Sequence, residues 1–393
     1  MSWTKKTFFY LLMFLFTMII MLILAEITSR VLWPKTMGTP GFAVPDPQRF
    51  YVLNKNYKGW FQGHPTEINN FGMRHKINYK VGKDENTFRI LILGDSVTFG
   101  DGNRLETTYP YQLEGMLKSW EPKVDWQVWN GGVPGYDAVT ELRTLEEIGP
   151  IYNPDLVIVG TYQNDLYSRD FDYRKNSEAS WLFKFRSLLI EHTYIYHQIK
   201  RMINVDMSSS IKNKFIFTAF GGREREKALF TKSLSTPDDV SKFKLKHQTI
   251  NRKLAAIPEY SWHPMENGGA SEIQYQSFEK ANLELQNLHN SGKWDILFFL
   301  NIAPDISEDG TSFINGEQNS INQYMLDILS KGGVPVISSY EAFWSYSPYE
   351  VPEAGAHALG AANKVKASIL LDHLKYKFNK SGDCLIGKIT CSN

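Results

Sequence analysis

Residues 89 to 100 read Arg-Ile-Leu-Ile-Leu-Gly-Asp-Ser-Val-Thr-Phe-Gly, a short apolar run that ends abruptly in Gly-Asp-Ser. An uninterrupted Ile and Leu run of this length is typical of a strand buried on both faces of a parallel sheet. Chemistry in open α/β sheets gathers at the carboxyl ends of the strands, so Ser96 stands where a nucleophile is expected. Taken alone, the pattern fits a capped turn between strand and helix equally well.

A strand–helix alternation continues from this stretch and predicts the fold class. Four further strands are expected at 124–129, 155–159, 295–300 and 334–337. Helices are expected at 109–120, 138–148, 181–202, 275–290, 318–330 and 359–376. Because strands that alternate with helices form parallel sheets with right-handed crossovers, we expect a flavodoxin-like, doubly wound sheet of five parallel strands.

The alternation is interrupted once, which defines the expected domain organisation. One domain spans 86–375 and carries an insertion at 171–272, and an irregular lead-in at 31–85 precedes it. Between Arg174 and Lys253 the insertion holds 17 Lys and Arg residues against 7 Asp and Glu residues. This imbalance fits either a cap that faces anionic headgroups or an acidic glycan, or a solvated helical face, and both interpretations stay open.

The N-terminal 30 residues contain an uncharged apolar run from Phe8 to Ala25. Eighteen helical residues extend ~27 Å, enough to cross a bilayer core. The run is longer than a usual signal-peptide core, and Leu-Ala-Glu makes a poor cleavage site, so we expect a retained anchor. Lys5 and Lys6 precede the run and place the N-terminus in the cytoplasm. We therefore expect a single-pass protein of the cytoplasmic (inner) membrane whose main domain is periplasmic or extracellular.

The net charge and the two cysteines, both in the C-terminal tail at 376–393, limit which partners and metal sites are expected. A net charge of +1 argues against a dedicated nucleic-acid-binding protein. Cys384 and Cys391 form either a small disulfide loop in an oxidising compartment or two free thiols. A zinc site there is not expected, because no His or third Cys is nearby. No cofactor or metal site is expected elsewhere.

The polar turns at 94–96, 130–136 and 160–165 resemble three of the four motif blocks of the SGNH (GDSL-type) serine hydrolase superfamily. They read Gly-Asp-Ser, Asn-Gly-Gly-Val-Pro-Gly-Tyr and Gly-Thr-Tyr-Gln-Asn-Asp, and each follows an expected strand. The resemblance covers roughly residues 86–170 and 273–375. It implies an α/β hydrolase that transfers acyl groups through a serine.

The resemblance also implies roles for single residues. Ser96 is the expected nucleophile, and its backbone N–H, the Gly132 N–H and the Asn164 side-chain amide are the expected oxyanion donors. These three groups follow adjacent strands, so they meet at one edge of the sheet. Asp95 and Asp165 are expected to cap turns rather than to take part in the chemistry.

The fourth block departs from the family pattern. The superfamily places its base in an Asp-x-x-His or Asp-Gly-His segment before the last helix. Residues 350–360 read Glu-Val-Pro-Glu-Ala-Gly-Ala-His-Ala-Leu-Gly, so His357 stands in the expected place. The usual Asp positions hold Ala354 and Gly355 instead.

This departure leaves three alternatives for the base. His357 acts with Ser96 as a dyad oriented by a backbone carbonyl, or Glu353 or Glu350 replaces the missing Asp, or the site has lost its base. His263, in a Trp-His-Pro segment of the insertion, is the other histidine we retain as a candidate.

Two functions from different classes follow. The first is a membrane-anchored, extracytoplasmic serine esterase or acyl-transfer enzyme that acts on small acyl esters, such as acetyl esters, of an envelope glycan or lipid. The second is a catalytically reduced SGNH domain that serves as a scaffold or accessory subunit of a membrane protein assembly. A hydrogen bond between His357 and the Ser96 hydroxyl would favour the enzyme.

Overall fold

The computed structural model describes residues 3–32, 39–61, 64–78, 80–171, 181–199, 270–307, 310–352, 354–355 and 357–380. Several predictions concern other residues and therefore lie outside the described part of the chain. These are the roles of Glu353 and His263, the Cys384–Cys391 disulfide, and the basic character of most of the insertion.

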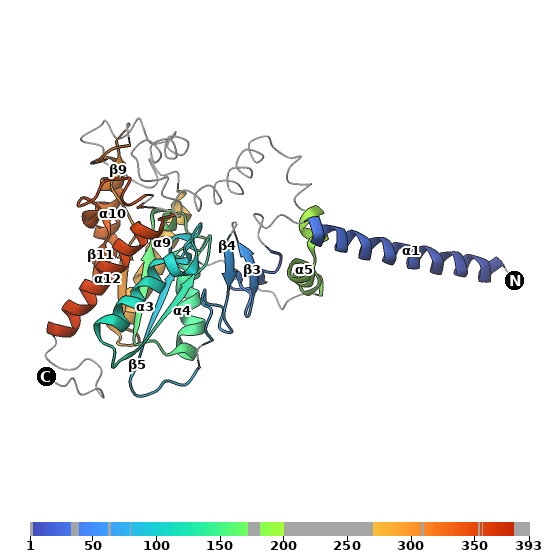
Figure 1. Ribbon diagram of the computed structural model, residues 1–393, viewed down its shortest axis with the longest axis horizontal. Helices are drawn as coiled ribbons and strands as arrows, with labels where there is room; N and C mark the ends of the chain where they lie inside the picture. Colours follow the sequence, from blue (N-terminus) through green and yellow to red (C-terminus); the bar gives the residue numbers. More distant parts are fainter. Residues whose placement is uncertain are drawn as a thin grey trace.

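A five-stranded parallel sheet forms the centre of the molecule, and it confirms the predicted fold class (Figure 1). Its strands are β5 (Thr87–Gly94), β6 (Asp125–Gly132), β7 (Leu156–Thr161), β8 (Ile296–Leu300) and β11 (Val336–Ser338). The strands lie in the order β11-β8-β7-β5-β6, and every neighbouring pair is parallel. Read from the other edge, this is the 2-1-3-4-5 order of flavodoxin-like sheets.

Helices cover both faces of the sheet, as predicted for a doubly wound fold. Those on one face are α3 (Tyr109–Trp120) and α12 (Gly360–Lys380), and those on the other are α4 (Ala138–Tyr152), α9 (Glu272–Asn290) and α10 (Glu317–Ser330). Each face of the sheet has its own hydrophobic core, and alternate residues of β5 point into one or the other. Ile90 and Ile92 pack toward α3 and α12, while Leu91 and Leu93 pack toward α4, α9 and α10. All four side chains are at most 1% exposed. This two-sided burial explains the uninterrupted apolar run.

Short elements connect these larger ones. They are α2 (Ser96–Phe99), η2 (Leu105–Thr107), η3 (Gln163–Tyr167), α11 (Tyr340–Phe343) and the pair β9 (Asp305–Ile306) and β10 (Phe313–Ile314). The last helix, α12, continues beyond residue 376, where the tail was expected to begin, because Phe378 still packs against Trp126 and Phe88 in the core.

The lead-in is more regular than predicted. It contains two antiparallel hairpins, β1 (Ala43–Asp46) with β2 (Phe50–Leu53), and β3 (Lys58–Phe61) with β4 (His64–Glu67). The expectation of irregular structure was wrong because each strand has only four residues, too few to show a period. The hairpins are stabilised by packing of lead-in side chains such as Tyr57 and Phe42 against Phe99, three residues after Ser96.

An N-terminal helix, α1 (Trp3–Leu32), extends away from the sheet (Figure 1). Its segment Lys6–Leu32 has 27 residues and a mean hydropathy of 2.7, and is long and apolar enough to cross a membrane by length and composition. Near its C-terminal end, Glu26 accepts hydrogen bonds from the backbone of Tyr194 and Ile195. These residues follow α5 (Trp181–His192), so the start of the insertion holds the end of α1.

Candidate active site

Ser96 lies at the carboxyl end of strand β5, which pairs with β6 and β7, where the sequence places the nucleophile. Asp95 caps helix α2, and its Oδ1 accepts a hydrogen bond from the Val97 N–H at 2.8 Å. The tight turn that this cap stabilises leaves Ser96 as the one partly exposed residue among residues 91 to 100. The capping role predicted for Asp95 is therefore what the structure shows.

His357 lies beside Ser96, although 260 residues separate them in the chain. Its Nε2 is 2.9 Å from the Ser96 hydroxyl oxygen, within hydrogen-bond distance. The imidazole is 39% exposed, so a substrate can approach from solvent. In the tautomer that carries its proton on Nδ1, Nε2 can accept the hydroxyl proton, which is the geometry a general base requires.

A carboxylate that the sequence analysis did not consider lies on the same side of the imidazole. Asp101 Oδ2 is 3.9 Å from His357 Nε2, and the Asp101 side chain is only 6% exposed. The Asp101 N–H donates to the Ser96 carbonyl at 3.0 Å, so this residue belongs to the turn that carries the nucleophile. Because it faces the nitrogen that contacts Ser96, its negative charge favours a protonated imidazole rather than a particular neutral tautomer.

Glu350, one suggested replacement for the missing Asp, is already engaged elsewhere. Its Oε2 accepts hydrogen bonds from the Ser347 N–H at 2.7 Å and the Ser347 hydroxyl at 2.5 Å. These two bonds hold the pKa of the Glu350 carboxyl below its usual value. Glu350 therefore stabilises a local surface turn, and the structure gives it no role at the imidazole.

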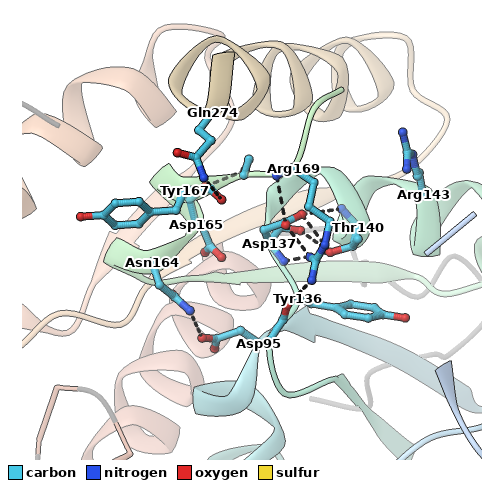
Figure 2. Close-up of polar contacts among 12 residues, drawn as sticks. Asp95, Tyr136, Asp137, Thr140, Arg143, Asn164, Asp165, Tyr167, Arg169 and Gln274 are labelled. Atoms are coloured by element: carbon cyan, nitrogen blue, oxygen red, sulfur yellow. Dashed lines mark hydrogen bonds and ion pairs between the residues drawn. The ribbon is translucent and has the colours of Figure 1, made fainter. Parts of the chain in front are cut away.

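The Asn164 amide points toward the nucleophile turn (Figure 2). Its Nδ2 donates to Asp95 Oδ2 at 2.7 Å. An amide nitrogen has two hydrogens, so one N–H remains for a second acceptor. Asp165, the next residue, accepts a hydrogen bond from the Tyr162 N–H at 2.8 Å and shapes the turn, as predicted.

The structure argues against Gly132 as an oxyanion donor. Its backbone N–H donates to Asn130 Oδ1 at 3.0 Å and is therefore occupied. Glycine is required here for packing, since an added Cβ would lie 2.3 Å from the Phe99 nitrogen. The same block contains another glycine whose N–H has no acceptor among the described residues.

That second glycine is Gly135, in the turn after β6. Its φ is +79°, a left-handed conformation that favours glycine, and no described residue accepts its N–H. The Arg169 guanidinium fixes this turn by donating to the Gly135 carbonyl at 3.0 Å and to Asp137 Oδ2 at 2.5 Å (Figure 2). The turn is thus held in place while its N–H stays available.

Two carboxyl groups are buried behind this turn. Glu141 is 1% exposed and Asp165 is 0% exposed, and no described residue donates to either Glu141 oxygen or to Asp165 Oδ1. Burial raises the pKa of both carboxyls well above the usual values, and the charges of Asp95 and Asp137 raise them further. Within the described ranges, no group of three or more His, Cys, Asp or Glu side chains could hold a metal ion.

These raised pKa values predict a pH-dependent stability. A carboxyl whose pKa is higher in the folded state stabilises the fold fully below its unfolded pKa, and this contribution is lost as the pH rises. Above pH ~5, the free energy of unfolding of the wild type should fall as the pH rises. In Glu141→Gln this slope should be smaller by up to about 1.4 kcal/mol per pH unit, the contribution of one proton. Unfolding of the full chain at a series of pH values measures this slope, and Glu146→Gln, at an exposed position of α4, should leave it unchanged.

No protein-family model and no curated protein matches the sequence. Solved structures do match: LAE5, an alpha/beta hydrolase from the metagenome of Lake Arreo, Spain, shares 13% identity over 72% of this chain and 94% of its own, with a TM-score of 0.36. A catalytic mutant of Axe2, an acetylxylan esterase from Geobacillus stearothermophilus, shares 13% identity over 72% of this chain and 93% of its own, with a TM-score of 0.36. The acetyl xylan esterase AlAXEase shares 12% identity over 73% of this chain and 100% of its own, with a TM-score of 0.37. At these values the matches assign neither a family nor an activity.

Proposed function

We propose that this chain is a serine esterase or acyl-transfer enzyme for small acyl esters, with Ser96 and His357 as its catalytic dyad. The observation that carries the proposal is the 2.9 Å contact between the Ser96 hydroxyl and His357 Nε2. A nucleophile at a strand end, with a base in hydrogen-bond contact and N–H groups nearby, is the arrangement that acyl transfer needs. The same contact weighs against the alternative of a catalytically reduced scaffold domain.

In the first half-reaction, the Ser96 oxygen attacks the carbonyl carbon of the ester while His357 Nε2 takes the hydroxyl proton. The tetrahedral intermediate then collapses, the bond to the leaving alcohol breaks, and that alcohol takes the proton from His357. An acyl group remains on the Ser96 oxygen. In the second half-reaction, His357 deprotonates either water or an acceptor alcohol, which attacks the acyl carbon. The bond between the acyl carbon and the Ser96 oxygen then breaks, that oxygen takes the proton from His357, and the acid or the new ester leaves.

The negative oxygen of the tetrahedral intermediate needs hydrogen-bond donors. We assign this role to the Ser96 N–H, the second Asn164 amide hydrogen and the Gly135 N–H, which replaces the Gly132 N–H of the sequence prediction. Each such donor contributes about 3 kcal/mol to the transition state. Asp95 orients the Asn164 donor through the 2.7 Å hydrogen bond.

The location and substrate are further parts of the proposal. Helix α1 supports a membrane anchor by its length and apolar composition, and Glu26 ties its end to the start of the insertion. An anchor with the N-terminus in the cytoplasm would place the site on the extracytoplasmic side of the membrane. Acetyl esters of an envelope glycan or lipid are the substrates that such a location and the motif resemblance favour.

A direct test uses the full chain in detergent and two readouts. Acetyl release from p-nitrophenyl acetate and from an acetylated oligosaccharide should be measurable. A fluorophosphonate should label a single serine, identified by mass spectrometry as Ser96, through a new oxygen–phosphorus bond with loss of fluoride. The absence of both reactions in folded protein would reject the esterase and favour the scaffold.

Asp101 provides a further prediction. Removal of its charge in Asp101→Asn should lower kcat/KM by roughly tenfold, ~1.4 kcal/mol, because the imidazolium loses a nearby anion. The positive charge of Arg74, which interacts with the charge of Asp101 in the wild type, remains in this variant. The acidic limb of the pH profile of kcat/KM should move to lower pH, since the protonated ring becomes less stable. The matched control is Asp372→Asn, an exposed position of α12, and an unmoved profile in Asp101→Asn would contradict this role.

A further inference from the structure

A buried lysine lies behind the loop that carries His357. Lys366, on helix α12, is 0% exposed. Its Nζ donates a hydrogen bond to the Gly355 carbonyl at 2.9 Å. Gly355 occupies one of the positions where the SGNH pattern expects the orienting Asp, so a main-chain carbonyl and a lysine meet where that carboxylate is missing.

The carbonyl on the other side of His357 is held as well. The Ala358 carbonyl accepts two hydrogen bonds at 2.8 Å, one from Asn103 Nδ2 and one from Asn363 Nδ2. Asn103 is 4% exposed and Asn363 is 1% exposed. Asn103 belongs to the turn after the nucleophile, whereas Asn363 belongs to α12. The loop is thus fixed from both directions, at carbonyls two residues before and one residue after His357.

Burial of a lysine is costly unless the cation has partners. Burial lowers the pKa of Lys366 to about 7, while the charge of Asp95 acts in the opposite direction. Asp95 is itself 1% exposed. Burial raises the pKa of its carboxyl, and hydrogen bonds from Asn164 and Val97 together with the charge of Lys366 lower it. The charges of Lys366 and Asp95 therefore stabilise each other, and Asp95 caps the nucleophile turn and orients the Asn164 amide.

We infer that Lys366 is a positioning residue that holds the His357 loop against the nucleophile turn. The inference rests on the proposed Ser96–His357 dyad. Asn103 and Asn363 share the task through the Ala358 carbonyl. This arrangement orients the base by fixing its backbone, so that the imidazole meets Ser96 without an Asp in the Asp-x-x-His position.

The test compares the full chain with Lys366→Met, which keeps the length of the side chain but removes its charge and its donor. We expect kcat to fall by roughly 10- to 100-fold, with KM within about threefold, because a displaced base slows the chemical step more than it weakens binding. Lys364→Met, an exposed position on the same helix, is the matched control and should keep the wild-type values.

A second readout is independent of turnover. In protein labelled with ¹⁵N-histidine, Ser96→Ala should shift the Nε2 signal of His357, which is identified by its loss in His357→Gln. In a Lys366→Met background the same Ser96→Ala change should leave that signal in place, because the ring no longer meets the hydroxyl. A merely structural lysine would lower the unfolding temperature without abolishing this response.

The possible outcomes separate the two proposals. Unchanged kcat and a persisting Ser96-dependent shift in Lys366→Met would overturn the positioning role and leave the esterase intact. An inactive wild type whose His357 signal still depends on both Ser96 and Lys366 would overturn the esterase and support the positioning role. If Lys366→Met does not fold, Asn363→Ala removes the other anchor, and a persisting shift with normal kcat there would overturn the inference.

Discussion

Ser96→Ala is expected to lower kcat for acetyl-ester hydrolysis by roughly 10⁴- to 10⁶-fold, the loss typical of removing a serine nucleophile. The hydroxyl is the group that forms the acyl intermediate, and no described neighbour can replace it. In the wild type, His357 Nε2 lies 2.9 Å from the Ser96 hydroxyl oxygen. Because alanine has no hydroxyl, the base then has no proton to accept. Initial rates of acetyl release by the purified full chain measure the effect.

The dyad also predicts how two substitutions combine. Because Ser96 and His357 act as one unit, the Ser96→Ala/His357→Ala double variant should be about as slow as Ser96→Ala alone. Ser119→Ala, an exposed serine on α3, is the matched control and should keep full activity. Equal rates in wild type and Ser96→Ala would show that any observed hydrolysis arises elsewhere.

Arg74→Met is expected to cause the largest loss of stability, about 3–5 kcal/mol, because it removes a buried cation that donates three hydrogen bonds to backbone carbonyls. The guanidinium donates to the carbonyls of Phe99, Gly100 and Asn103 at 2.7, 2.8 and 2.6 Å. It is 2% exposed and lies 4.4 Å from the centre of the Phe99 ring. Without it, three carbonyls of the turn that follows Ser96 lose this charged donor.

Thermal and urea unfolding of the full chain, followed by tryptophan fluorescence, measure this loss. Activity should fall together with stability, since the same turn carries Asp101 and Asn103. The control is Arg104→Met, an exposed arginine in the same segment. A change below 1 kcal/mol in Arg74→Met would mean that water replaces the guanidinium at all three carbonyls.

Local sequence signals were sufficient for the sheet and its helices. The apolar run of β5 encodes a strand buried on both faces, because both of its faces meet helices. Helix α3 begins at Tyr109 and ends at Trp120, as predicted. In contrast, the four-residue strands of the lead-in carry too few residues for a periodic signal, and their pairing depends on packing against Phe99.

The candidate site divides in the same way. Ser96, Asn164 and His357 were identified from motifs because each follows a strand or precedes a helix in a recognisable local pattern. Whether the Gly132 N–H was available depended on how the Asn130 side chain is oriented. Asn130 Nδ2 donates to the Phe99 carbonyl at 3.4 Å while its Oδ1 accepts from the Gly132 N–H, so the packing of β6 against α2 decides this. The motif therefore pointed to this turn, and we propose Gly135 in place of Gly132 as its donor.

The order of strands and helices, the strand-end serine and the histidine before the last helix could all be predicted, because each depends on neighbouring residues. The surroundings of the base could not be predicted, because they depend on residues that meet only in the folded chain. Asp101 lies 3.9 Å from His357, and Lys366 holds the Gly355 carbonyl at 2.9 Å. The Asp101 contact requires the nucleophile turn and the His357 loop to meet at one edge of the sheet, and the Lys366 contact requires that loop to fold back on α12. No local pattern in the chain records either arrangement.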